Sequence, residues 1–137
     1  MSSSATDAPS VKRLDVALVS AEKVVWNGDA SFVIARTVEG EVGFLPDHMP
    51  FMAVMQSGAV EIRTLAGEVL LAAVPKGFIS VANNRVSILA EHAELGREID
   101  AAEARRELEA LEAGDTDAED YDDRLRLAEA RVRAATS

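Results

Sequence analysis

His48 is the side chain in this sequence best suited to acid–base chemistry, because an imidazole titrates near neutral pH. It stands in the segment Gly40–Pro50, which reads Gly-Glu-Val-Gly-Phe-Leu-Pro-Asp-His-Met-Pro. Catalysis would need a nucleophile or a carboxylate pair with an orienting group, and the neighbouring sequence offers neither. The other histidine, His92, is far along the chain and there is no cysteine, so no zinc site is expected.

The segment Gly40–Pro50 is instead expected to be a stiff bend between two β-rich halves. Pro46 and Pro50 withhold backbone donors, so the residues between them cannot form a central strand. The glycines allow positive φ or close backbone approach. We therefore expect His48 near the tip of a rigid loop and Glu41 between its glycines.

Composition places the chain among soluble cytoplasmic proteins. Its 137 residues suffice for one domain with a small appendage. Aromatic residues make up only 4%, so valine, leucine, isoleucine and alanine must build the core. No run approaches the roughly 20 apolar residues of a membrane-spanning helix. The polar start does not resemble a secretory signal, and residues 1–11 are expected to be a disordered tail.

The net charge of −10 argues against nucleic acid and anionic lipid as partners, since both attract basic surfaces. The charge is unevenly spread. Residues 1–98 carry 8 basic and 12 acidic side chains, residues 99–123 carry 2 and 11, and residues 124–137 carry 4 and 1. An acidic block is therefore followed directly by a basic tail.

Residues 12–95 read as an all-β body, a sandwich or barrel of eight to ten short strands. Apolar residues alternate in Arg13–Ala21, and the pair Asn27-Gly28 suggests a turn between strands at Val24–Trp26 and Ser31–Thr37. Further strands are expected at 42–45, 51–55, 60–63, 68–74, 78–81 and 85–89, with Asn83-Asn84 as the last tight turn.

Residues 96–137 read as a hairpin of two helices. Asp100 followed by Glu103 predicts a helix start, and Gly114 predicts its end. The expected apolar stripes are Ala101, Ala104, Leu108 and Leu111 on the first helix, and Tyr121, Leu125, Ala128, Val132 and Ala135 on the second. Because these stripes are thin and rich in alanine, we expect weak docking and a hairpin that can detach from the body.

The pattern Gly-Glu-x-Gly-x-Leu-Pro-x-His-x-Pro resembles the signature segment of the epsilon subunits of F-type ATP synthases. Leu14–Val16, Lys76–Val81, Asn84–Ala90 and Glu98–Asp100 resemble further segments of that family in the same order and spacing. The resemblance extends over about residues 13–135. It implies a ten-stranded sandwich of two sheets followed by a C-terminal two-helix hairpin.

The resemblance also implies a function. A family member would be a non-catalytic rotor subunit that joins the gamma shaft to the membrane c ring during proton-driven ATP synthesis. It would be peripheral, on the cytoplasmic face of the bacterial plasma membrane, and associated with the membrane only through the complex. Glu41 and His48 match ring-contacting positions. An extended hairpin would impede ATP hydrolysis, with basic residues facing the alpha and beta catalytic subunits: Arg124, Arg126, Arg131 and Arg133.

Some members bind ATP at the hairpin through an Ile/Leu-Asp-x-x-Arg-Ala motif. Ile99, Asp100 and Ala104 match this motif, but Glu103 occupies the arginine position. A carboxylate there would repel a triphosphate. We therefore expect neither ATP sensing nor another cofactor.

Plainer interpretations stay open. His48 can be a locally bonded loop histidine, Glu41 an exposed turn residue, and the arginines of 124–133 simple partners of acids in the first helix. The acidic run 115–123 lacks the ligand alternation and glycine of a calcium loop, which favours a solvated linker. An alternative function is a stand-alone β-sandwich ligand-binding module with a helical oligomerisation tail.

Overall fold

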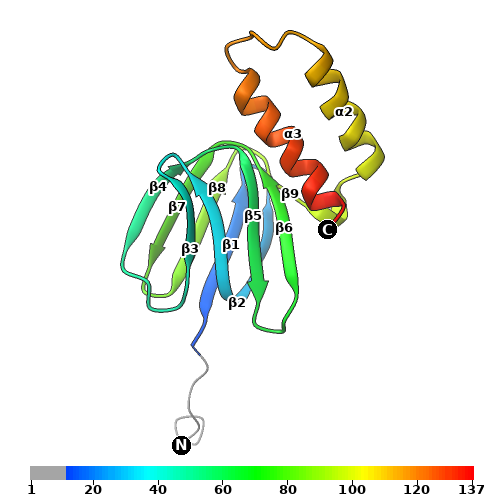
Figure 1. Ribbon diagram of the computed structural model, residues 1–137. Coiled ribbons are helices and arrows are strands. Elements are labelled where there is room, and N and C mark those ends of the chain that lie inside the picture. Colours follow the sequence, from blue (N-terminus) through cyan, green and yellow to red (C-terminus); the bar gives the residue numbers. More distant parts are fainter. Residues whose placement is uncertain (1–11) are drawn as a thin grey trace, which may run out of the picture.

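The computed structural model describes residues 12–137, and the tail expected at residues 1–11 lies outside the described part of the chain. Nine strands in the described residues form one continuous sheet that folds into two layers (Figure 1). The strands are β1 (Leu14–Ser20), β2 (Val24–Thr37), β3 (Gly40–Phe44), β4 (Phe51–Met55), β5 (Gly58–Thr64), β6 (Val69–Val74), β7 (Gly77–Ala82), β8 (Arg85–Ala90) and β9 (Glu94–Leu95).

Strand β2 joins the two layers because it takes part in both. Its first half pairs antiparallel with β1, from Val24 opposite Val19 to Ala30 opposite Leu14. Its second half pairs with β3 and β5, and the register against β5 shifts between Ala30 and Phe32. Such a shift bends a strand. One layer therefore contains β1, β8, β7 and β4, and the other contains β3, β2, β5, β6 and β9.

The turn expected at Asn27-Gly28 is wrong, because both residues lie inside β2, opposite Ala17 and Val16 of β1. A Cβ at Gly28 would stand 2.9 Å from the ring of Trp26, so the glycine makes room for that side chain. Pairing with β1 overrides the local turn preference. The two strands expected at Val24–Trp26 and Ser31–Thr37 are thus one, and β9 is a strand that the sequence did not predict. The described residues form nine strands where the resemblance implied ten. The sandwich followed by a helical hairpin is confirmed.

The remaining strands lie where alternation places them, within two residues at each end. The turn between β7 and β8 is also confirmed: Asn83 and Asn84 have φ of 52° and 61°, as a two-residue hairpin turn requires. Asparagine tolerates this left-handed conformation better than most residues.

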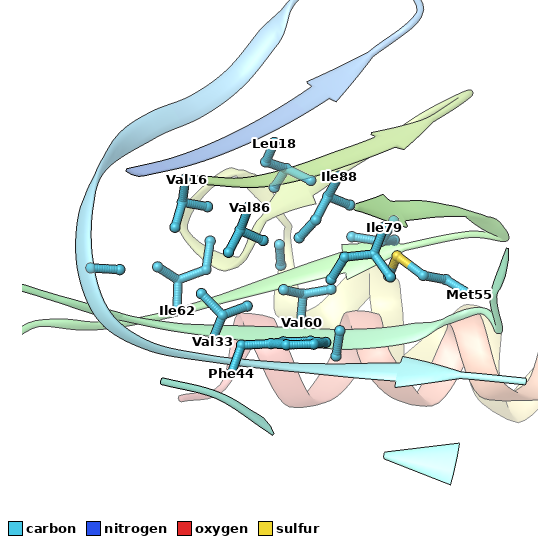
Figure 2. Close-up of a cluster of buried hydrophobic side chains, with 14 of the residues drawn as sticks. Val16, Leu18, Val33, Phe44, Met55, Val60, Ile62, Ile79, Val86 and Ile88 are labelled. Atoms are coloured by element: carbon cyan, nitrogen blue, oxygen red, sulfur yellow. The ribbon is translucent and has the colours of Figure 1, made fainter. Parts of the chain in front are cut away.

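The core lies between the two layers and is mainly aliphatic, as the low aromatic content predicts (Figure 2). Phe44 at the end of β3 is the one aromatic side chain among the largest fully buried residues of the described chain. Val16, Leu18, Val86 and Ile88 enter from β1 and β8. Strands β2, β5, β4 and β7 contribute Val33, Val60, Ile62, Met55 and Ile79.

The chain after β9 forms a short turn, η1 (Gly96–Glu98), and the helices α2 (Ala101–Ala113) and α3 (Tyr121–Ala135). The predicted start of α2 is confirmed, since Asp100 Oδ1 accepts a 3.1 Å hydrogen bond from the Glu103 amide. The predicted end is confirmed as well, with Gly114 directly after Ala113. No helix in the described residues has the length and apolarity needed to span a membrane.

Helix α3 lies against the outer side of β5 and β6, and α2 lies beyond it (Figure 1). Alternation in the β5–β6 hairpin predicts polar residues on its outer side, and the placement of α3 shows that this prediction is wrong for β6. Leu71 and Ala73 of β6 point outward and are buried in a second apolar cluster with Ala130 and Ala134 of α3. The buried alanines of α3 therefore lie outside the predicted stripe, because that helix packs against both the sheet and α2.

We expect Phe44→Ala to lower the free energy of unfolding by about 3–5 kcal/mol, because it removes a fully buried ring from between the two layers. Leu45→Ala is the matched control: its side chain is 59% exposed, and its loss should cost no more than about 0.5 kcal/mol. Urea denaturation followed by circular dichroism measures both values. Similar losses in the two variants would contradict this view of the core.

Candidate functional site

The bend at Gly40–Pro50 consists of strand β3 followed by a tight turn. The turn is closed by a 3.2 Å hydrogen bond from the His48 amide to the Leu45 carbonyl. Pro46 occupies its second position and Asp47 its third, with a φ of 68°. Proline followed by a residue of positive φ is the arrangement of a type II turn. The predicted stiffness of this bend therefore has a specific backbone origin.

Asp47 fastens the turn to two distant parts of the chain. Its backbone amide donates to Asn84 Oδ1, and its Oδ1 accepts from Asn84 Nδ2 at 3.1 Å. Its Oδ2 stands 2.6 Å from Lys12 Nζ. The hydrogen bond from Lys12, and then the one from Asn84, lower the pKa of the Asp47 carboxyl, while the same pairing raises the pKa of Lys12.

The His48 ring is held locally. Its Nδ1 lies 2.7 Å from the Met49 carbonyl oxygen, and because a carbonyl can only accept, Nδ1 carries the proton. The ring meets Phe44 edge-on with centroids 5.0 Å apart, and Phe51 at 6.2 Å. This geometry agrees with the plainer interpretation of His48 as a loop histidine that is bonded locally. The ring is half-buried at the end of the core.

Glu41 does not lie beside His48. It is exposed near the start of β3, opposite Arg36 of β2, whereas His48 follows the other end of that strand. Glu41 lines a cleft of about 280 Å³ between the sandwich and α3, which Arg126 and Arg133 also line. The structure therefore places the two expected ring-contacting residues at opposite ends of β3.

An uncharged outer face, bordered by the ion pair of Asp15 on β1 with Arg85 on β8, is the surface feature that sequence reasoning missed. Two rows of residues cross β4, β7, β8 and β1, and no member is charged: Val54, Phe78, Leu89 and Val19 in one row, Met52, Ser80, Ser87 and Ala17 in the other. Met52 is 65% exposed and Leu89 is 51% exposed. The sequence did contain a sign of this face, because apolar side chains occupy strand positions that alternation predicts to point outward.

Small side chains determine how closely α3 approaches the sandwich. Ala130 and Ala134 of α3 share a buried cluster with Leu71, Ala73 and Ile99. At Gly96 of η1, a Cβ would collide with the carbonyl oxygen of Ala134, so only glycine allows this approach. The apolar area beneath the helix is correspondingly modest, in agreement with the thin stripes in the sequence.

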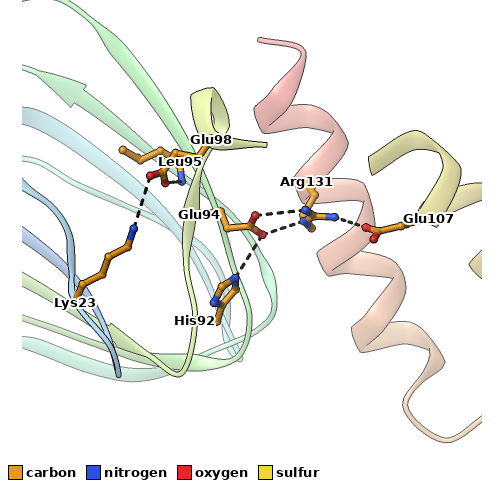
Figure 3. A network of polar contacts seen from close by, with 7 residues as sticks. All are labelled: Lys23, His92, Glu94, Leu95, Glu98, Glu107 and Arg131. Carbon is orange, nitrogen blue, oxygen red and sulfur yellow. Dashed lines mark hydrogen bonds and ion pairs between the residues drawn. The ribbon is translucent and has the colours of Figure 1, made fainter. Parts of the chain in front are cut away.

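Arg131 makes the polar connection between the sandwich and both helices (Figure 3). Its Nε and one terminal nitrogen donate to the two oxygens of Glu94 of β9 at 3.0 and 3.3 Å. Its other terminal nitrogen donates to Glu107 of α2. The side chains of Arg131 and Glu94 are only 18% and 23% exposed. The hydrogen bond to Glu94 raises the pKa of Arg131, so it stays charged.

The other three arginines of α3 lie apart from this network. Arg133 stands 3.6 Å from Glu61 of β5, and Arg126 stands 3.9 Å from Asp123 within α3. Arg124 is exposed. Of the four arginines, Arg131 alone pairs with an acid of the first helix.

The residues of the ATP motif have structural roles in this chain. Ile99 is buried under the hairpin, and the Asp100 carboxylate caps α2. Glu103 is exposed on the first turn. That ATP does not bind at this position stays a prediction. Within residues 12–137, no group of three or more metal-ligating side chains is close enough to hold an ion.

Comparisons with known proteins agree on one family. Residues 13–96 match the family described as ATP synthase, Delta/Epsilon chain, beta-sandwich domain. The ATP synthase epsilon chain of Streptomyces avermitilis is 52% identical over 90% of this chain and 96% of its own length. That of Nocardia farcinica is 42% identical over 93% of both chains.

A solved structure shares the fold at lower identity. A chain in the Euglena gracilis mitochondrial ATP synthase, solved as OSCP, F1 and c ring, is 22% identical with a TM-score of 0.77. The match covers 96% of this chain and 86% of that one. This likeness extends over the helices as well as the sandwich.

We expect the Asp47 carboxyl to titrate below about 3.9, the value usual for an unfolded chain. Because its pKa is lowered in the folded protein, its contribution to stability is complete above about pH 3.9 and is lost as the pH falls through the folded value. Carboxyl-carbon NMR measures the midpoint.

Lys12→Gln should raise that midpoint, and Lys23→Gln, which alters a lysine paired with Glu98 instead, should leave it unchanged. A wild-type midpoint at or above 3.9 would contradict the role of Lys12 in fixing the bend.

Proposed function

The chain belongs to the family of ATP synthase epsilon chains, and from this premise we propose that it is a non-catalytic subunit of the central stalk. In this role it couples the gamma shaft to the membrane c ring during proton-driven ATP synthesis. It acts by presenting surfaces of fixed shape rather than reactive groups. Association with the cytoplasmic face of the plasma membrane would come through the complex.

The uncharged outer face of β4, β7, β8 and β1 carries this proposal. A chain with a net charge of −10 has ample charged residues to solvate a sheet face, yet this one exposes Met52, Val54, Phe78 and Leu89. Apolar patches of this kind on soluble chains usually mark protein interfaces. We assign this face to the gamma shaft, the partner that must hold the subunit throughout rotation.

The bend is the proposed contact with the c ring. Its turn is stiff, and Leu45 and Met49 are exposed beside His48. Glu41 stands near the other end of β3, about 10 Å along the strand from Phe44, which precedes the turn. A ring surface that meets both Glu41 and His48 must therefore run along β3, which pairs only with β2 among the described strands.

The hairpin is the proposed brake on ATP hydrolysis. In the docked position seen here, Arg131 and Arg133 face glutamates of this same chain. If the hairpin extends, these residues together with Arg124 and Arg126 would become available to acidic segments of the alpha and beta catalytic subunits. The modest apolar contact beneath α3 supports such a movement.

We expect Phe78→Glu to prevent binding to gamma, because it places a charge in the middle of the uncharged face. Loss of a central anchor costs about 2–4 kcal/mol, or about 30- to 1000-fold in affinity. Co-purification with tagged gamma and titration calorimetry measure the loss.

Val69→Glu is the matched control for this variant, since Val69 is 59% exposed but lies on β6, away from the uncharged face. It should bind gamma normally. Circular dichroism must show that both variants are folded. Normal binding of gamma by folded Phe78→Glu would refute the assignment of this face.

We expect deletion of residues 100–137 to leave assembly with gamma and the c ring intact and to raise ATP hydrolysis, since the sandwich has its own core. Assembly is measured by co-purification, and hydrolysis by phosphate release from the purified complex. Unchanged hydrolysis in an intact, coupled complex would remove the braking role and leave the structural role in place.

A further inference from the structure

We propose that the cleft between the sandwich and α3 binds a small oxyanion of the class of inorganic phosphate. The cleft has a volume of about 280 Å³ and is lined by Arg36 of β2 and by Arg126 and Arg133 of α3. The N–H donors of a guanidinium group match the acceptor oxygens of such an anion. This binding site goes beyond the coupling and braking functions and depends on neither of them.

Arg126 contributes a buried donor that has no acceptor. Its Nε is buried and makes no hydrogen bond within residues 12–137. One of its terminal nitrogens stands 3.9 Å from Asp123 Oδ1, which is too far for a hydrogen bond. A buried donor that stays unpaired lowers stability, so most such donors in folded proteins are satisfied. An oxyanion in the cleft would supply the acceptor.

Arg133 and Arg36 likewise make no hydrogen bond to a carboxylate among the described residues. A terminal nitrogen of Arg133 stands 3.6 Å from one oxygen of Glu61, and the other oxygen of Glu61 accepts from Arg63 at 2.7 Å. Arg36 donates a long bond, 3.4 Å, to the amide oxygen of Gln56. The chain has 24 acidic and 14 basic residues, so a shortage of carboxylates does not explain these arginines. Their donors are available to a ligand.

The cleft brings the arginines together from two elements. Arg126 and Arg133 are two helical turns apart, so they lie on the same side of α3, about 10 Å from each other along its axis. The side chain of Arg36 lies over Gly58, where a Cβ would stand 3.6 Å from Arg36 Cδ. The complete set of donors therefore exists only while α3 lies against the sandwich.

Two glutamates in the same cleft determine which anions can bind. Glu41 and Glu129 line the cleft together with the arginines, and neither has an ion pair in the part of the chain that the structure describes. The lining therefore carries one more positive than negative charge. Because the carboxylates repel an anion, a ligand must engage several guanidinium groups at once, which favours a phosphate-like anion over chloride.

The cleft is separate from the segment that resembles the ATP motif. Ile99, Asp100 and Glu103 do not line it. Its volume of about 280 Å³ lies just below the range of roughly 300–1,000 Å³ that is usual for pockets of drug-sized ligands. This size suits a small inorganic anion better than a nucleotide.

The experiment titrates the full chain, labelled with nitrogen-15, with inorganic phosphate at an ionic strength held constant with sodium chloride. Two-dimensional NMR spectra record the Nε–Hε groups of the arginines and the backbone amides. We expect the Nε–Hε signals of Arg36, Arg126 and Arg133 and the amide signal of Gly58 to shift together and to saturate.

Two pairs of variants test the site from opposite directions. Arg126→Gln removes a donor, and Arg105→Gln makes the same charge change at an exposed residue of α2 that does not line the cleft. Glu129→Gln removes a repelling carboxylate, and Glu109→Gln is its exposed control on α2. Dispersion of the amide spectrum shows whether each variant is folded.

We expect Arg126→Gln to weaken phosphate binding about ten-fold, as for the loss of a hydrogen bond to a charged group. Glu129→Gln should tighten binding about two- to five-fold, as for the removal of one exposed like charge. Arg105→Gln and Glu109→Gln should leave the affinity unchanged.

Shifts in the parent chain that are absent, or that do not saturate, would overturn the proposal. Equal weakening in Arg126→Gln and Arg105→Gln would also overturn it, because binding would then depend on overall charge. Glu129→Gln alters only an exposed side chain, so it decides the matter even if Arg126→Gln does not fold: unchanged affinity in that variant contradicts the site. All measurements use the chain alone, so their failure and the failure of the coupling function are distinguishable.

Discussion

The two layers of the sandwich must bury their inner faces against each other, and this requirement determines which surfaces are free to meet other proteins. Phe44 and the aliphatic side chains fill the space between the layers, and these side chains are almost fully buried. A two-layer sandwich leaves one outer face on each side. In this chain the two outer faces differ: α3 covers β5 and β6, whereas the face of β4, β7, β8 and β1 stays open, with two uncharged rows beside the Asp15–Arg85 ion pair.

The same core also stiffens the bend that follows β3. Phe44 anchors the end of the strand, and the rings of Phe44 and Phe51 both meet the His48 ring in T-shaped arrangements. Asp47 connects the turn to Asn84, between β7 and β8, and to Lys12 before β1. A loop attached at three points can transmit force, as the proposed link between a shaft and a ring requires.

The hairpin is attached in a different way from the strands. Its apolar contact consists mainly of alanines, and its polar contact converges on Arg131, which bonds the sandwich and α2 at once. A partly buried ion pair contributes specificity more reliably than stability, because desolvation offsets much of the attraction. Such an attachment defines one docked position without making it permanent.

The sequence by itself determined most of the strands, the tight turn at Asn83-Asn84, the limits of the first helix and the family. Each of these depends on neighbouring residues, through alternation, capping or left-handed turn preference. Only the tertiary structure decided that β2 continues through Asn27-Gly28, because β1 supplies its partner there. It also separated Glu41 from His48 and joined Arg131 to Glu94 and Glu107. Contacts between residues far apart in the chain depend on how the layers pack, and local sequence patterns do not contain that information.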